Sequence, residues 1–410
     1  MSKKSILSSS FWLLAGEGGQ RFGSLFLFLA YVPWLGIEAA GQIMVAYAYA
    51  MSVWLFIDLG LGLYGTKMVA SANTDNASVQ LSVGVERGLL GLAGSVAYVV
   101  ITYSISAASL PVALGFGMYL FFRAASVDWR LRGESRFREL AMVAVMATIT
   151  QILFGFFAVQ PDAWRYTATI PWALFSVIFF VGTWSVAGAR LAVRQVRVSR
   201  HFRFDNLKKS YLFSASNGAS VLFQQSPVLV LSYIGDSGNV ASFALVHRVA
   251  MSLLFFYQII GAAVFPKLVR ASEYSFRRSV HIAANMSFAF VALGASLMAS
   301  VFLVVFIGGF FAQYVEGTSF PVVLSFGAFV VFRGLRVAPA RLLLGSGGER
   351  RYAGSMLVAL IGFLLCLFIV DALGILGANS IAIAFVTIEA LLVSWLWAVI
   401  VRKFVRGEMS

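Results

Sequence analysis

Long apolar runs constrain this chain more than any other feature of its sequence. Of its 410 residues, 60% are apolar and 12% are charged, whereas a soluble domain averages about 25% charged residues. A helix needs about 20 predominantly apolar residues to cross a bilayer. Such runs lie at roughly 11–34, 41–66, 88–108, 110–127, 139–160, 168–189, 211–234, 239–265, 282–308, 319–340, 352–373 and 378–401. We therefore predict an all-α integral membrane protein with about 12 transmembrane helices and no sizeable soluble domain.

The basic residues predict how these helices are oriented. The net charge is +14, and most of the 31 Lys and Arg residues fall in every second loop. The first of these loops contain Lys3 and Lys4, then Lys67 and Arg87, then the four arginines of residues 130–138. The intervening loops contain Arg165 and otherwise acidic residues. Because cytoplasmic loops are enriched in Lys and Arg, we predict that both termini are cytoplasmic. The basic composition is then a consequence of topology, and we expect no nucleic acid as a partner.

Several functional classes are disfavoured by residues that are rare or out of context. The single cysteine, Cys366, and three scattered histidines give no disulfide framework and no pattern for a metal or catalytic centre. Gly60, Gly62 and Gly65 form a GxGxxG sequence, but a dinucleotide site needs a preceding strand in a soluble βαβ unit. We interpret these glycines as positions where helices pack closely or bend. We expect no cofactor, no metal and no catalytic residue.

Internal similarity suggests that the chain has two related halves. Ala50, Met51 and Ser52 recur as 250–252, and Phe122-Arg123 recurs as 332–333. Each match falls on the corresponding predicted helix of its half. Six crossings in each half give the halves the same orientation, as in parallel-repeat transporters. We predict two pseudo-symmetric six-helix lobes around a central cavity, with helices 1–6 in residues 1–205 and helices 7–12 in residues 206–410.

Ionisable residues inside the predicted helices mark the candidate site. An arginine near the bilayer centre costs about 2.5–3.5 kcal/mol, so such residues should be paired or should face a polar cavity. Glu17 in the first helix aligns with Asn217 in the seventh, and Gln224 lies two turns further on the same polar stripe. The predicted substrate-binding residues are Arg21, Arg248, Arg333, Arg336, Arg123, Glu17, Asn217 and Gln224.

Alternative roles stay open for several of these residues. Arg21 lies four residues after Glu17, so the two can form a local ion pair. Arg123 can extend its charged end to the cytoplasmic interface. Asp58 and Glu389 are candidate ion- or proton-coupling sites or polar packing residues. Pro227 interrupts the backbone bonding of the seventh helix and is a candidate hinge.

Five short segments resemble the Wzx-type polysaccharide flippases of the multidrug, oligosaccharidyl-lipid and polysaccharide exporter superfamily. These segments are 34–41 (WLGIEAAG), 58–67 (DLGLGLYGTK), 128–137 (DWRLRGESRF), 243–248 (FALVHR) and 263–266 (AVFP). They occur in the family's order and on the corresponding helices. The resemblance therefore covers essentially the whole chain.

This resemblance implies a function. Such a protein moves an undecaprenyl-diphosphate-linked oligosaccharide from the cytoplasmic to the outer leaflet of the bacterial inner membrane, by alternating access and without enzymatic activity. Its partners are the lipid-linked oligosaccharide, membrane lipids and polysaccharide assembly proteins. The diphosphate carries about two negative charges, which arginine side chains bind well.

Other functions remain as alternatives. A drug or small-solute exporter of the same superfamily would have a similar architecture, although organic cations favour an acidic cavity. A membrane-embedded polysaccharide polymerase or acyltransferase would also have many helices. An acyltransferase usually needs a histidine in the membrane, and His247 lies within a predicted helix without an evident partner. A lipid scaffold without transport is a further alternative.

We expect single cysteines to report the predicted orientation. In a Cys366→Ser background, cysteines at Ser199 and Ser346 should resist an impermeant thiol reagent added outside the cell, because both positions fall in basic, cytoplasmic loops. A cysteine at Ser237 should react. Labelling of intact cells is the measurement, and the reverse pattern would overturn the orientation.

Overall fold

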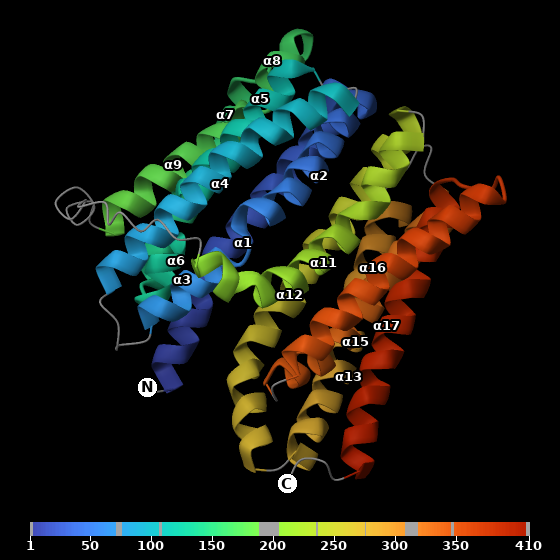
Figure 1. The fold of residues 1–410 in the computed structure, drawn as a ribbon. Helices are drawn as coiled ribbons and strands as arrows, with labels where there is room; N and C mark the ends of the chain where they lie inside the picture. The colour runs from blue at the N-terminus through green and yellow to red at the C-terminus, as the bar shows by residue number, and fades with distance from the viewer. Residues whose placement is uncertain are drawn as a thin grey trace. The chain divides into compact units, whose positions relative to one another are not determined.

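The computed structural model describes residues 3–70, 76–105, 109–187, 205–234, 237–274, 276–307, 319–345 and 348–406. Helices and short turns make up this part of the chain, and no strand occurs in it, so the all-α prediction is confirmed. The chain forms two compact units, Met1–Val221 and Leu222–Ser410, which Figure 1 colours from blue to green and from yellow-green to red. The boundary between functional lobes at residues 205 and 206 stays a prediction.

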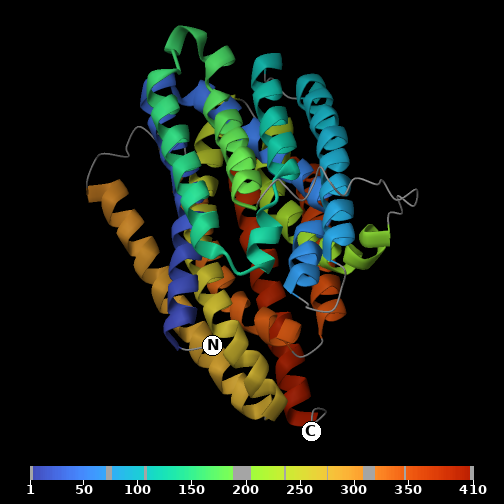
Figure 2. The same cartoon turned by 90° about the vertical axis from the view of Figure 1, so that its left-hand side faces the viewer.

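The first unit is a bundle of long helices, against which the short helices α3 and α6 pack. Helix α1 packs along α7, α4 packs along α5, and α9 contacts both α5 and α7. Figure 2 shows α4 and α5 side by side. The elements are α1 (Lys3–Leu35), α2 (Ile37–Asp58), α3 (Leu61–Ala70), α4 (Asn76–Ile105), α5 (Leu110–Ala125), α6 (Asp128–Gly133), α7 (Phe137–Phe157), η1 (Pro161–Ala163), α8 (Trp164–Thr167) and α9 (Ile170–Ala187).

The second unit is arranged around α15. This helix packs against α12, α13, α16 and α17. Phe385 of α17 anchors an aromatic cluster, with its ring centroid 4.4 Å from that of Phe329 and 4.8 Å from that of Phe223. The helices are α11 (Asp205–Ile234), within which the boundary between the units falls, α12 (Ser237–Tyr274), α13 (Phe276–Ile307), α15 (Phe320–Gly345), α16 (Glu349–Ala372) and α17 (Ala378–Arg406).

A long helix occupies each of the twelve predicted positions in the described chain. Ten helical segments are long and apolar enough to cross a membrane. The two long helices outside this set, α1 and α11, are the two that carry the predicted polar stripes, and α11 retains a shorter apolar stretch at Gly218–Ile234. The chain is thus a multi-pass membrane protein in which the first helix of each predicted half is the more polar one.

The predicted second helix, 41–66, is not continuous. Helix α2 ends at Asp58. Leu59 (φ 39°) and Gly60 (φ 72°) then adopt left-handed backbone conformations before α3 begins. This left-handed conformation costs an ordinary residue about 1–2 kcal/mol, and Gly60 adopts it without that cost. The break directs α3 against α4 and α6. The GxGxxG sequence therefore begins at a helix break.

Apolar side chains hold α3 in this position. Leu61, Tyr64, Val83 and Trp129 form a buried cluster between α3, α4 and α6. A Cβ atom at Gly65 would lie 2.6 Å from the Trp129 ring, closer than atoms can approach. The absence of a side chain at this glycine lets the indole pack directly on the α3 backbone. The interpretation of these glycines as packing and bending positions is confirmed.

Glycines also set the close approach of α1 to α7. A Cβ atom at Gly16 would lie 3.0 Å from the Ala141 Cα atom, and one at Gly23 would lie 2.4 Å from Thr148 Cγ2. These glycines lie about two turns apart on one face of α1. The spacing brings the polar residues of α1 beside the start of α7.

We expect Gly23→Leu to destabilise the first unit. The larger side chain must displace Thr148, and overpacking of this kind costs about 1–3 kcal/mol. Gly84→Leu on α4 is the matched control, because nothing lies within 4 Å of a Cβ atom there. The measurement is the thermal unfolding midpoint of the purified protein in detergent. Equal midpoints for the two variants would contradict the close approach.

Candidate functional site

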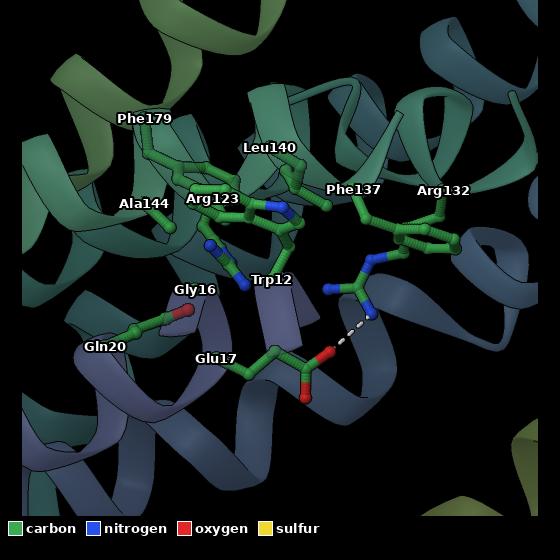
Figure 3. A pocket seen from close by; sticks show the side chains of 11 residues that line it. Trp12, Gly16, Glu17, Gln20, Arg123, Arg132, Phe137, Leu140, Ala144 and Phe179 are labelled. Carbon is green, nitrogen blue, oxygen red and sulfur yellow. Dashed lines mark hydrogen bonds and ion pairs between the residues drawn. The ribbon is translucent and has the colours of Figure 1, made fainter. Parts of the chain in front are cut away.

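A pocket in the first unit gathers several polar side chains of the chain. It lies between α1, α5, α6, α7 and α9, and its empty space of about 290 Å³ includes open solvent. Figure 3 shows the guanidinium groups of Arg123 and Arg132 directed toward the same space, with the Glu17 carboxylate beside it. The lining residues are Trp12, Gly16, Glu17, Gln20, Arg123, Arg132, Phe137, Leu140, Ala141, Ala144 and Phe179.

Glu17 forms its ion pair with a residue far away in the sequence. Its carboxylate accepts a hydrogen bond from Arg132 Nη1 at 2.9 Å, across from α1 to α6. Both side chains are partly exposed, Glu17 at 36% and Arg132 at 32%. The sequence left a local pair between Glu17 and Arg21 open as an alternative, and the structure adds Arg132 as a partner of Glu17. The short helix α6 makes this possible because it carries Arg132 back to α1.

Arg123 is held by an aromatic ring at the other side of the pocket. Its guanidinium carbon lies 4.3 Å from the centroid of the Phe179 ring, which is the geometry of a cation–π contact. Arg123 Nη1 and Arg132 Nε are buried and have no hydrogen-bond partner among the residues that the structure describes. The pocket therefore contains two cationic donors without acceptors. Arg123 lines the pocket, and its role in substrate binding stays a prediction.

A buried ion network lies behind the pocket. Arg87 of α4 reaches Asp58 Oδ1 at 3.1 Å and Asp128 Oδ1 at 3.4 Å, and Arg132 Nη2 reaches Asp128 Oδ2 at 3.5 Å. Only 3% of Arg87 is exposed. The Ser126 hydroxyl also donates to Asp128, at 3.1 Å. The network ties the end of α2 and the start of α6 to the interior of α4.

The network corrects the sequence-based assignment of Arg87. This residue belongs among the predicted cytoplasmic loop cations, but it lies inside α4 and is buried between two carboxylates. A charge pattern along the sequence does not distinguish a solvated loop arginine from one that is buried inside a helix. The network also explains why Asp58 closes α2, because the turn after it places its carboxylate against α4.

A second buried cluster lies in the second unit. Glu389 of α17 is fully buried, with its Oε1 atom 3.1 Å from Arg336 Nε and 3.6 Å from Arg333 Nη1. Arg336 Nη1 also lies 3.1 Å from the Met356 sulfur atom. The sequence places Arg333 and Arg336 on one face of their helix with no carboxylate on that face, and in the structure α17 supplies the carboxylate. Their role in substrate binding stays a prediction.

Both candidate coupling carboxylates lie next to arginine side chains. Asp58 is paired with Arg87, and Glu389 lies against Arg333 and Arg336. A metal or sodium ion at either carboxylate would have to compete with a guanidinium group at close range. In the described part of the chain, no three His, Cys, Asp or Glu side chains are grouped as metal ligands.

Backbone oxygens next to the predicted hinge accept hydrogen bonds from side chains. Pro227 has no N–H to donate to the Phe223 carbonyl. The Ser226 hydroxyl donates to that carbonyl at 2.9 Å, and His247 Nε2 of α12 donates to the Gln224 carbonyl at 2.7 Å. His247, for which the sequence showed no partner, thus supports α11 at Pro227. The function of Pro227 as a hinge stays a prediction.

The remaining predicted residues lie on the expected helices, outside the lining of this pocket. Arg21 lies on α1, and Arg248 lies on α12. Asn217 belongs to α11, but its side chain is outside the described part of the structure. Of the predicted substrate-binding residues, the pocket brings together Glu17 and Arg123, and the cluster around Glu389 brings together Arg333 and Arg336.

Sequence reasoning missed Arg132 as a site residue. It counted this arginine only as one cation of a basic loop. The segment 128–137 nevertheless contained a signal, because five of its ten residues are charged, with both signs present, and two more are aromatic. Such a segment between two membrane helices is a candidate for a short helix that folds back onto the bundle.

Comparisons with known proteins show which fold this is. A structure described as an inward-facing conformation of a multidrug resistance MATE family transporter of the MOP superfamily matches with a TM-score of 0.70 and 14% identity, over 98% of this chain and 96% of that chain. A MATE structure in complex with MaL6 matches with a TM-score of 0.65 and 13% identity, over 98% and 96% of the two chains.

A third structure is described by its pocket. It is a MOP superfamily transporter from Pyrococcus furiosus whose binding pocket is said to have reverse polarity, suggesting a different function. It matches with a TM-score of 0.65 and 14% identity, over 100% of this chain and 97% of that chain. No family model and no curated protein sequence matches the chain. The chain therefore has the fold of MATE transporters.

We expect Arg87→Met to destabilise the protein strongly. The substitution leaves Asp58 without the guanidinium that faces it, and breaking a buried ion pair on one side costs about 3–5 kcal/mol. Arg350→Met, at an exposed position on α16, is the control. Thermal unfolding in detergent measures the difference. An Arg87→Met midpoint equal to that of the control would show that the network does not hold α2, α4 and α6 together.

Proposed function

We propose that this protein is a membrane exporter that moves an amphiphile with an oxyanion head group by alternating access. The fold supports transport, since the solved structures that it matches over nearly their whole length are transporters. The observation that supports an oxyanion is the pair of arginine donors without acceptors, Arg123 Nη1 and Arg132 Nε, which belong to residues lining one pocket.

The chemistry of the pocket fits such a head group. Guanidinium groups bind phosphate oxygens through paired, charge-assisted hydrogen bonds. The Trp12, Phe137 and Phe179 rings line the same pocket, and aromatic faces suit the apolar side of a sugar ring. A polar head group is costly in the hydrocarbon core, so a transporter has to shelter it while the lipid tail stays in the bilayer.

The cargo that fits this description best is the lipid-linked oligosaccharide implied by the sequence resemblance. Its diphosphate supplies two negative charges, and its saccharide supplies hydroxyl groups for side chains such as Gln20. A membrane potential that is negative inside favours outward movement of a negative charge by about 2.3 kcal/mol per 100 mV. The proposed direction of transport is from the cytoplasmic to the outer leaflet.

Export of drugs or other small solutes is the second candidate, and the comparisons favour it. One of the similar solved structures is described as a multidrug resistance transporter. The charges in this chain weigh against organic cations as cargo. Glu17, Asp58 and Glu389 each lie within ion-pair distance of an arginine, so a cation would have to displace a guanidinium group.

We expect the protein in reconstituted vesicles to translocate a fluorescent pyrophosphoryl-linked lipid and not the cation ethidium. Arg123→Ala should lower the translocation rate about tenfold or more, because a hydrogen bond to a charged group contributes about 1.5–3 kcal/mol. The assay is the fraction of probe accessible to an impermeant quencher over time. Arg350→Ala serves as the control for protein amount and folding.

The opposite result would identify the other cargo. If ethidium crosses at a protein-dependent rate while the pyrophosphoryl lipid stays in its leaflet, the second candidate replaces the first. If neither probe moves while the fold is intact by thermal unfolding, the transport proposal for both cargo classes is overturned.

A further inference from the structure

The ion pairs of the first unit fall into two groups that differ in solvent exposure. Both side chains in the Glu17–Arg132 pair are about one third exposed, whereas the Arg87 side chain is only 4% exposed where it meets Asp58 and Asp128. A pair that already borders water can open at low cost, because the released carboxylate is hydrated again. A buried pair cannot, because its partners would lose their charge compensation.

The opening of the exposed pair would not release Arg132 from its place. Arg132 Nη2 lies 3.5 Å from Asp128 Oδ2, and Asp128 is fixed in turn by Arg87 and Ser126. Loss of Glu17 would therefore leave the Arg132 guanidinium in position with Nη1 available. Arg132 Nε is already without an acceptor in the described structure.

Arg123 is the second arginine at this pocket. Its side chain is fixed by the Phe179 ring, and its buried Nη1 has no acceptor among the described residues. Figure 3 shows the Arg123 and Arg132 guanidinium groups on either side of the space that the Glu17 carboxylate borders. Arg123 Nη1 and Arg132 Nε are both donors, so the complementary ligand is one with several acceptor oxygens.

We propose that this pocket is a binding site for a phosphate-type oxyanion, held between Arg123 and Arg132, and that the ligand displaces the Glu17 carboxylate from Arg132. The inference rests on the proposed function, and it adds that the Glu17 carboxylate competes with the ligand for Arg132. In the ligand-free protein, Glu17 stands in for the ligand and keeps Arg132 compensated. When the oxyanion binds, one oxygen replaces the Glu17 oxygen at Arg132 Nη1, and others accept from Arg123.

This exchange has a consequence for transport. Without Glu17, Asp128 would be the remaining carboxylate paired with Arg132, and the two guanidinium groups would hold a diphosphate too tightly for release into the outer leaflet. The Glu17 carboxylate and the oxyanion compete for the same donor of Arg132. Return of Glu17 to Arg132 therefore lowers the affinity of the pocket for the oxyanion. Glu17 is thus a residue that sets affinity and promotes release.

The experiment measures binding of inorganic pyrophosphate to the purified full-length protein by titration calorimetry in detergent. Glu17→Gln removes the competing charge and should tighten binding about fivefold, the size expected for a partly exposed ion pair. Glu139→Gln is the matched control, because Glu139 pairs with Arg136 outside the pocket. Arg123→Met should weaken binding about tenfold or more.

Each outcome decides the proposal. Tighter binding by Glu17→Gln with unchanged binding by Glu139→Gln supports the exchange. Equal or weaker binding by Glu17→Gln, in a protein whose unfolding midpoint matches the wild type, assigns Glu17 a structural role and overturns it. Absence of pyrophosphate binding in every variant overturns the site itself.

The vesicle assay separates this inference from the proposed function. If pyrophosphate binds as expected but no lipid is translocated, the site stands and the exporter proposal fails. If translocation depends on Arg123 but Glu17→Gln leaves pyrophosphate affinity unchanged, the exporter stands and the displacement of Glu17 is wrong.

Discussion

Much of the first unit depends on one constraint, which is that the buried guanidinium group of Arg87 needs carboxylates around it. An arginine buried among membrane helices is costly unless carboxylates surround it, and here Asp58 and Asp128 do so from two other helices. To bring these carboxylates together, α2 has to end at Asp58, and the chain after α5 has to form the short helix α6. The break at Leu59 and Gly60 and the packing of α3 on Trp129 follow from the same arrangement.

This buried network also fixes the position of Arg132 at the pocket. Arg132 is anchored through Asp128 on one side and faces Glu17 and the pocket on the other. The anchored side is shielded from water, and the pocket side borders it. Binding sites need donors that are held in place before the ligand arrives, since ordering them afterwards would reduce affinity. The first unit achieves this by placing a rigid ion network directly behind an exchangeable ion pair.

Matched positions in the two halves of the sequence meet different environments in the structure. The alignment pairs Arg123 with Arg333, and they lie on α5 and α15. Arg123 packs on the Phe179 ring and lines a pocket, whereas Arg333 lies near the fully buried Glu389. The aromatic contact leaves donor groups of Arg123 for a ligand. The carboxylate of Glu389 instead makes the cluster around Arg336 a contact between α15 and α17, which links the helix at the centre of the second unit to its neighbour.

The sequence by itself determined the helical membrane architecture, because apolar runs of bilayer length and glycines at close helix contacts are local properties that can be read residue by residue. It also determined which helices carry charge. Only the tertiary structure decided the partners of those charges. Glu17 of α1 pairs with Arg132 of α6, Glu389 meets two arginines on another helix, and Arg87 is buried inside a helix. Ion pairing depends on distance in space and on burial. In a bundle of long helices, neither follows from spacing along one helix.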